Sequence, residues 1–322
     1  MTIRTRLTEK LGVTHPIMLA PMDLVADGKL AAAVSRSGGF GIIGGGYGNE
    51  TWLKRELDAA GDARIGVGFI TWSMAKNPRL LDLALERKPA AVLLSFGEVK
   101  PHADKIKKAG ALLICQVQTL AHAREAVEND ADVIVAQGAE GGGHGISRGT
   151  FALVPAVADV ARGIPVAAAG GVADGRGLAA ALMLGADGVL VGTRFYASVE
   201  AAGLPAAKLH IVNAVGDRTI RGILFDIARR NVWPAPFTGR VLRNEFSERW
   251  RGRESELMQH PEEAERYAKA RDSGDFRTAA VIAGEAVDLI ADIPPAAEIV
   301  ERMAKEAATL LAGASNCYRA ER

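Results

Sequence analysis

The stretch PVAAAGGVADGRGLAAALMLGADGVLVGTRF, residues 165–195, holds two short apolar runs that end in glycine, with a segment of helical pattern between them. The runs Pro165–Gly171 and Gly188–Thr193 are apolar throughout, which is typical of parallel strands buried on both faces. Between them, Asp174 can cap a helix rich in Ala and Leu that ends near Gly185. The stretch therefore predicts a strand–helix–strand unit.

The same alternation extends outward from this unit to residue 17. Six more apolar runs precede it, at Ile17–Met22, Gly39–Gly45, Arg64–Ile70, Ala90–Phe96, Ala111–Val117 and Asp132–Gly138. Helical patterns separate the runs, at Asp27–Ser37, Glu50–Ala60, Pro78–Glu86, Pro101–Ala109, Thr119–Asn129, Pro155–Arg162 and Gly175–Leu184. Eight consecutive units without a hairpin signal are what barrel closure requires, so the sequence predicts an α/β fold, a (β/α)₈ TIM barrel, rather than an open doubly wound sheet.

After residue 195 the pattern changes to tryptophan-containing turns and a long charged run. We expect residues 1–202 and 285–322 to form the barrel, and residues 203–284 to form a small helical substrate or lid domain inserted before the C-terminal helices. The closing segment from Gly284 to Leu311 has helical spacing and is expected to pack on the barrel wall, with Ile293-Pro294-Pro295 dividing it into two helices.

Composition excludes several classes of function. Among 322 residues, 39 basic side chains face 38 acidic ones, so no net field recruits nucleic acid or an anionic membrane. The N-terminus has no signal-peptide pattern, and a cytoplasmic protein is the expectation. Cys115 and Cys317 lack metal-ligand spacing, and no metal site is predicted.

The glycines that end the two runs of the opening stretch are the candidates for a phosphate site. A missing Cβ lets backbone N–H groups approach a ligand, and the last two strands of such barrels often build a phosphate site. We predict this role for Gly170, Gly171, Gly192 and Thr193, whose hydroxyl adds a donor. The alternative is that these glycines only permit tight turns.

A second glycine cluster, in VIVAQGAEGGGHGISRG at residues 133–149, holds one histidine, His144. Gly141 to Gly143 leave the backbone bare for a planar ligand, and an imidazole at the mouth can act as a donor or base near neutral pH. A loop histidine is more often structural, but its place at the end of the sixth strand, next to the predicted phosphate site, favours a catalytic role.

Other strand ends add to this mouth. Pro21-Met22 gives an apolar lip, Gln116 and Gln137 supply amides for the edge of a heterocycle, and Tyr47 and Trp72 either line a substrate or simply pack. Backbone N–H groups for a phosphate, glycines that leave room for a planar ring, amide side chains and one histidine suit a flat phosphorylated cofactor. Flavin mononucleotide (FMN) fits, while a phosphosugar or another phosphorylated ring stays open.

The segments HPIMLAPM, GGFGIIGGG, AQGAEGGGHG and the opening stretch together resemble the nitronate monooxygenase family. The resemblance implies an FMN-containing barrel without a metal, which oxidises small alkyl nitronates with O₂ to a carbonyl compound and nitrite. It implies that His144 is catalytic, binding the nitro group or taking the α-proton of a neutral nitroalkane. It also implies FMN contacts at Ala20, Pro21, Met22, Gln116, Gln137, Gly142, Gly170, Gly171, Gly192 and Thr193.

One position departs from the family pattern. Many members carry Asn in the third strand, where this chain has Gly68 in GVGF, so a side-chain contact to the flavin is absent or replaced. Flavin reductases that pass hydride from NAD(P)H to a quinone or an enoyl thioester resemble the same segments, and a catalytically silent barrel that binds a phosphorylated ligand is a third reading. Partners other than small molecules and O₂ are not indicated, although the sequence allows a homo-oligomer.

Overall fold

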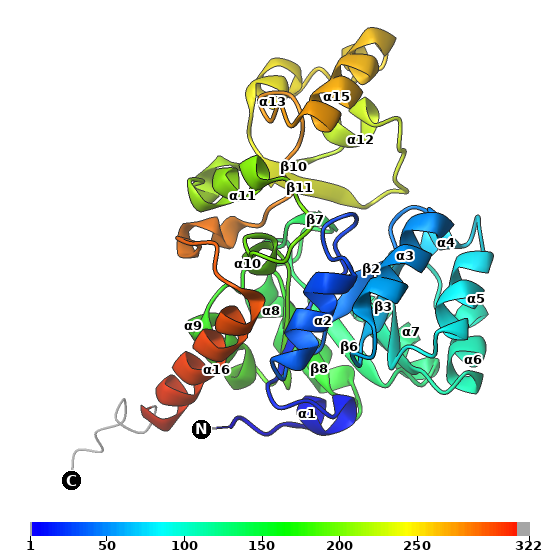
Figure 1. Ribbon diagram of the computed structural model, residues 1–322, viewed down its shortest axis with the longest axis vertical. Coiled ribbons are helices and arrows are strands. Elements are labelled where there is room, and N and C mark those ends of the chain that lie inside the picture. Colours follow the sequence, from blue (N-terminus) through cyan, green and yellow to red (C-terminus); the bar gives the residue numbers. More distant parts are fainter. Residues whose placement is uncertain (1, 314–322) are drawn as a thin grey trace.

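The computed structural model describes residues 2–313, so Cys317 and the end of the predicted 285–322 segment lie outside the described residues. Eight parallel strands form one sheet in the order β1-β9-β8-β6-β5-β4-β3-β2. A parallel bridge between Met18 and Phe40 brings the two edges of the sheet together. The protein is therefore a (β/α)₈ barrel, as predicted (Figure 1).

Each of the eight predicted runs contains one barrel strand, and the strands are shorter than the runs because the run ends turn into loops. The strands are β1 (Ile17–Leu19), β2 (Ile42–Gly44), β3 (Gly66–Ile70), β4 (Ala91–Ser95), β5 (Leu112–Val117), β6 (Val133–Gln137), β8 (Val166–Ala169) and β9 (Gly188–Val191).

The helices around the sheet include all seven predicted ones, six with closely matching bounds, and three short ones that were not predicted. They are α1 (Arg6–Leu11), α2 (Gly28–Arg36), α3 (Glu50–Ala60), α4 (Thr71–Met74), α5 (Arg79–Glu86), α6 (Lys100–Lys108), α7 (Leu120–Glu128), α8 (Thr150–Val160), α9 (Gly175–Met183) and α10 (Thr193–Tyr196). The prediction that the sixth helical segment starts at Pro155 is wrong, since α8 starts at Thr150 and contains the proline. The carbonyl that Pro155 leaves unbonded belongs to Phe151, which is exposed and can be hydrated.

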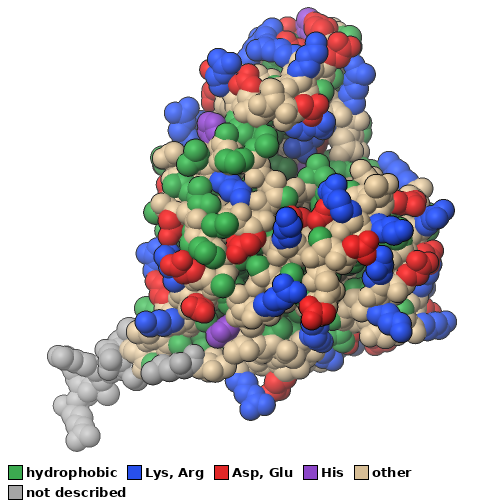
Figure 2. Space-filling view, in the orientation of Figure 1, with side chains coloured by type: hydrophobic (Ala, Val, Ile, Leu, Met, Phe, Trp, Pro, Cys, Tyr) green, Lys and Arg blue, Asp and Glu red, His purple; other side chains and the backbone are tan. Residues whose placement is uncertain are grey.

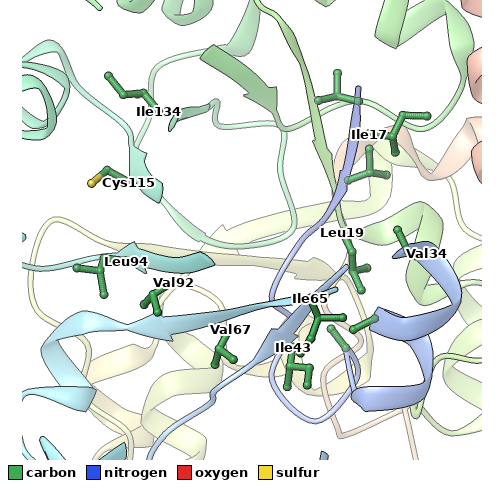
Figure 3. Close-up of a cluster of buried hydrophobic side chains, with 14 of the residues drawn as sticks. Ile17, Leu19, Val34, Ile43, Ile65, Val67, Val92, Leu94, Cys115 and Ile134 are labelled. Atoms are coloured by element: carbon green, nitrogen blue, oxygen red, sulfur yellow. The ribbon is translucent and has the colours of Figure 1, made fainter. Parts of the chain in front are cut away.

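Alternate side chains of each strand serve two separate cores. Met18 and Leu93 point into the barrel, together with Leu7 and Leu11 of α1. Their strand neighbours, such as Ile17 and Leu94, join the layer between sheet and helices (Figure 3). Both layers are apolar, which accounts for the unbroken hydrophobic runs in the sequence.

A smaller unit stands above the C-terminal ends of the barrel strands (Figure 1). Its elements are α11 (Pro205–Val212), η1 (Gly216–Arg218), β10 (Thr219–Gly222), α12 (Leu224–Ala228), β11 (Thr238–Leu242), α13 (Glu245–Trp250), α14 (Glu254–Leu257) and α15 (Pro261–Ser273). The prediction named only helices here, but β10 and β11 form an antiparallel pair that a third strand, β7 (Gly143–Gly145), extends. This sheet was not predicted because its strands are short and contain arginine and glycine in place of an apolar run.

The chain then returns through η2 (Glu285–Leu289) to α16 (Ala296–Gly313), which packs against α9 and α2 on the barrel wall, as predicted. Gly175 permits the close approach, because a Cβ there would lie 2.5 Å from Cβ of Glu306. On the face shown in Figure 2, acidic and basic side chains are interspersed. Within residues 2–313, no helix is both long and apolar enough to span a membrane.

Candidate functional site

His144 lies on strand β7 rather than in an irregular loop. Gly143 adopts a positive φ of 73°, which turns the chain out of the glycine cluster and into the strand. β7 pairs with β11 of the small unit, where Gly239 lies opposite His144. A Cβ at Gly239 would lie 3.4 Å from Nε2 of His144, so the glycine leaves room for the ring. The small unit thus sets the position of the histidine.

Two side chains of the small unit hold the imidazole ring. Nε2 of His144 lies 3.0 and 3.1 Å from the two carboxylate oxygens of Asp226, on α12. Trp233 stacks on the ring, with 3.4 Å between ring centroids and 6° between planes. The side chains of His144 and Asp226 are only 9% and 8% exposed, so bulk water screens their interaction weakly.

This arrangement favours a neutral imidazole with a defined tautomer. Burial lowers the pKa of His144 below its ordinary value, while the hydrogen bond and charge of Asp226 act in the opposite direction. Because a carboxylate only accepts hydrogen bonds, the proton of the neutral ring is on Nε2, which donates a hydrogen bond to Asp226. Nδ1 is then the nitrogen with a free lone pair, which is the atom that can take a proton from a substrate.

The predicted amides meet in one cluster beneath β7. The side-chain oxygen of Gln137 accepts from Nε2 of Gln116 at 3.0 Å and from Nε2 of Gln118 at 2.9 Å. The amide of Gln137 in turn donates to the backbone carbonyl of His144 at 3.0 Å. Gln118, which the sequence analysis did not select, is buried, and its own carbonyl oxygen has no partner among the described residues.

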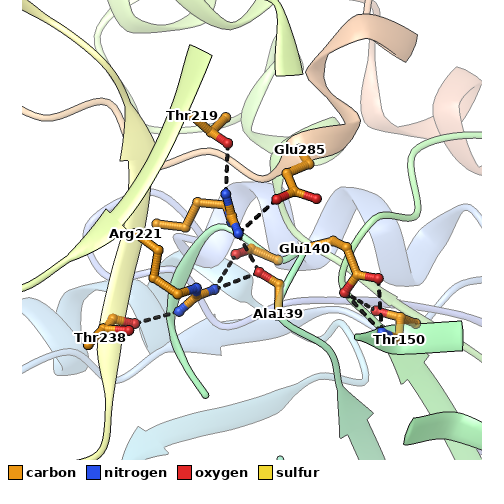
Figure 4. Close-up of polar contacts among 9 residues, drawn as sticks. Ala139, Glu140, Thr150, Thr219, Arg221, Thr238 and Glu285 are labelled. Carbon is orange, nitrogen blue, oxygen red and sulfur yellow. Dashed lines mark hydrogen bonds and ion pairs between the residues drawn. The ribbon is translucent and has the colours of Figure 1, made fainter. Parts of the chain in front are cut away.

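The loop before His144 is fixed from the small unit by two arginines (Figure 4). Arg221 donates to the backbone carbonyls of Ala139, Gly141 and Thr238, at 2.8, 3.0 and 2.6 Å. Arg240 donates to the same Ala139 carbonyl at 3.0 Å and pairs with Glu285 at 2.8 Å. Burial lowers the pKa of the Arg221 guanidinium to about 10, so it is still charged at neutral pH.

Glutamate 140 anchors the other side of this loop. The Glu140 carboxylate accepts from the backbone N–H of Thr150 at 2.9 Å and from its hydroxyl at 2.8 Å. Thr150 is the first residue of α8, where the helix dipole favours a negative charge. The sequence alone indicates no role for Glu140 beyond its place in the glycine cluster.

The predicted phosphate-binding glycines lie together at the ends of β8 and β9. Gly170 and Gly171 have positive φ values of 96° and 76°, and a Cβ at Gly170 would lie 2.8 Å from the carbonyl oxygen of Gly138. The hydroxyl of Thr193 accepts from the backbone N–H of Gly284 at 3.0 Å and keeps its own proton to donate. The same return segment closes over Gly142, where a Cβ would lie 2.7 Å from the carbonyl carbon of Ala283.

The first strand end lies on the opposite side of this group. A Cβ at Gly192 would lie 3.5 Å from Cβ of Ala20 and 3.7 Å from the sulfur of Met22. Gly68 lies under Pro21, because a Cβ there would come within 2.3 Å of the proline Cβ. The side chain that many family members carry at this position therefore has no space here.

Tyr47 and Trp72 lie at the same mouth and contact a residue that the sequence analysis did not select. The indole N–H of Trp233 donates to the Tyr47 hydroxyl at 3.1 Å, and the rings of Trp72 and Trp233 meet edge to face at 5.3 Å. Trp233 and Asp226 went unselected because no local pattern connects them with a histidine more than 80 residues earlier. A clue was available in WPAPF, a turn rich in aromatic residues within the predicted small domain.

Comparisons with known proteins show the family of this chain. The family model for nitronate monooxygenase matches residues 4–64 and 62–306. A nitronate monooxygenase of Neurospora crassa is 35% identical over 91% of this chain and 89% of its own length. An octahydro-1H-indene-4-carboxyl-CoA dehydrogenase of Rhodococcus jostii is 37% identical over 68% of this chain and 63% of its own length.

A solved structure of FabK from Thermotoga maritima superposes with a TM-score of 0.86 and 33% identity, covering 98% of this chain and all of its own. The likeness in sequence and in fold thus extends over nearly the whole chain. The chain belongs to the nitronate monooxygenase family and is a flavin-dependent oxidoreductase.

Proposed function

We propose that the protein binds FMN and oxidises alkyl nitronates with O₂ to a carbonyl compound and nitrite, with His144 as the active-site base. The observation that carries the proposal is the buried His144–Asp226 pair, held by β7 beside the amide cluster and the glycine-rich ends of β8 and β9. Family membership supports the same reaction.

The residues at the mouth fit FMN. The buried carbonyl oxygen of Gln118 has no partner among residues 2–313, and the N–H edge of a flavin ring would supply one. The bare backbone at Gly171 and Gly192, with the free proton of the Thr193 hydroxyl, would hold the phosphate. When bound, FMN supplies the electron acceptor for the substrate and the route to O₂.

The side chains of this chain have three tasks in that reaction. Nδ1 of His144 takes the α-proton when the substrate is a neutral nitroalkane, and Asp226 stabilises the imidazolium that results. Trp233 covers one face of the imidazole and excludes water from it. A nitronate supplied as the anion has already lost this proton, so its oxidation needs His144 less.

Two measurements test the proposal in sequence. The purified protein should show the absorption spectrum of an oxidised flavin, and heat-released cofactor should be FMN. Anaerobic mixing with ethylnitronate or propionate 3-nitronate should then bleach the flavin. A flavin that no small nitronate reduces would sink the assignment.

The alternative is a flavin reductase that draws hydride from NAD(P)H and passes it to a quinone or an enoyl thioester. The likeness to FabK over nearly the whole chain favours it. Rapid bleaching by NADH or NADPH, without bleaching by nitronates, would select this function. A colourless protein that takes up no FMN would instead favour a ligand-binding barrel without flavin chemistry.

A further inference from the structure

Five aromatic side chains form one cluster at the mouth of the barrel: Tyr47, Trp72, Phe96, Trp233 and Phe237. Trp233 stands at the centre, with ring centroids 6.2 Å from Tyr47, 5.3 Å from Trp72, 5.1 Å from Phe96 and 6.3 Å from Phe237. All these contacts are edge to face, the arrangement that aromatic quadrupoles favour. The five rings therefore form one continuous cluster around Trp233.

The cluster joins the barrel to the small unit at the catalytic histidine. Tyr47, Trp72 and Phe96 follow β2, β3 and β4, whereas Trp233 and Phe237 lie between α12 and β11. Trp233 also stacks face to face on His144. A substrate at the free edge of the imidazole therefore lies next to Trp233, the centre of the cluster.

Two features of the cluster are typical of a ligand site rather than of ordinary packing. Phe96 has a positive φ of 63°, a strained conformation for a bulky residue, and such strain concentrates at binding sites. The indole N–H of Trp72 is buried and has no acceptor among the described residues. A nitro or nitronate oxygen is an acceptor of the right kind.

The charges around the cluster disfavour a second anionic group on the substrate. The carboxylate of Asp226 lies beside His144 and carries a negative charge. Arg229, three residues after Asp226, is half-buried and donates to the Tyr267 hydroxyl at 3.3 Å. Lys76 stands 4.5 Å from the ring centre of Trp72 and is already engaged with that ring.

We propose that the aromatic cluster selects nitro compounds and nitronates that carry an aromatic ring next to the nitro-bearing carbon, over small aliphatic or carboxylated ones. This inference rests on the proposed function. Burial of a phenyl ring should give a preference of roughly 10- to 100-fold.

The test compares kcat/KM for the nitronate of phenylnitromethane with those for ethylnitronate and propionate 3-nitronate. The expected order places the aryl nitronate at least about tenfold ahead, and Trp233→Leu and Phe237→Leu should each reduce the preference while the flavin spectrum is kept. Phe151→Leu, at an exposed aromatic residue of α8, is the matched control and should keep it. An aryl nitronate no better than ethylnitronate overturns the inference.

A binding measurement separates this inference from the proposed function. Phenylacetate and propionate, planar carboxylates that do not react, are titrated while the flavin absorption is followed. Tighter binding of phenylacetate by about tenfold supports the aromatic site even if no nitronate is oxidised. Equal binding, together with oxidation of small nitronates, leaves the proposed function standing and overturns the aromatic selection.

Discussion

The hydrogen bond between Asp226 and Nε2 of His144 determines which nitrogen of the ring can act as a base. Since burial lowers the pKa of His144, the neutral ring prevails at neutral pH. The activity toward a neutral nitroalkane should therefore rise with pH and reach half its maximum below the ordinary histidine value near 6.5. The charged groups that act on the ring are Asp226, Arg229 and Arg221.

Substitution Asp226→Asn tests this assignment. The carboxylate raises the pKa of His144, so its loss should move the midpoint of the pH profile to lower pH and reduce kcat by roughly 10- to 100-fold. Asp226→Glu keeps the charge and should keep the midpoint. The measurement is kcat/KM for nitroethane against pH at constant flavin content. An unchanged profile in Asp226→Asn would show that the carboxylate does not act on His144.

Individual site residues were predictable from the sequence to different degrees. His144, Gln116 and Gln137 were identifiable because each ends a strand or follows one closely, and barrel strands bring such positions together. Asp226 and Trp233 were not, because their proximity to His144 depends on how β11 pairs with β7, and three-residue pairings leave no periodic pattern. The family roles of the FMN-contacting residues stay predictions.

At the scale of the elements, the approach of β1 to β3 depends on Gly68. A Cβ at this position would overlap Pro21, so Gly68→Asn should lower the free energy of unfolding by roughly 1–3 kcal/mol, seen as a lower Tm. Gly222→Asn, where a Cβ meets open space, is the control. In a double-mutant cycle, Gly68→Asn should cost less in a Pro21→Gly background, because glycine lacks the overlapped Cβ. Equal Tm values for Gly68→Asn and the natural protein would refute the overlap.

The starts of several helices were predictable because one N-cap residue marks each of them. Asp27, Asn49, Thr119 and Asp174 cap their helices by accepting a backbone N–H, and those helix starts fall within a residue or two of the predicted ones. The start of α8 was predicted wrongly because proline is usual at a helix start. Proline is also tolerated inside a helix where the carbonyl that loses its backbone hydrogen bond belongs to an exposed residue. The strands of the small unit have no apolar alternation to reveal them.

At the scale of the whole molecule, two arginines of the small unit hold the loop that carries His144. Arg221→Met removes three hydrogen bonds to backbone carbonyls. We expect a loss of roughly 2–4 kcal/mol of unfolding free energy and a lower kcat. Hydrogen exchange should speed up more in residues 139–145 than in the barrel strands. Arg218→Met, at an exposed neighbour, is the control, and equal exchange in the two variants would contradict this role.

The barrel was predictable as a whole because eight similar units repeat along the chain. The contacts between the small unit and His144 were not predictable, since they join segments that are distant in the sequence. The consequence is that the site is built from both parts: the barrel supplies the glycines and amides, and the small unit supplies Asp226, Trp233 and the strand that positions His144.

The central claim, that His144 is the base of a nitronate-oxidising flavoenzyme, is tested most directly by comparing nitroethane with preformed ethylnitronate in His144→Ala. FMN should be retained, because the predicted phosphate site lies at the ends of β8 and β9 and does not include His144. Activity with nitroethane should fall by about 10²- to 10⁴-fold, whereas activity with ethylnitronate should fall by about tenfold or less, since its α-proton is already gone. An equal loss with both substrates, or full activity with nitroethane, would contradict the claim.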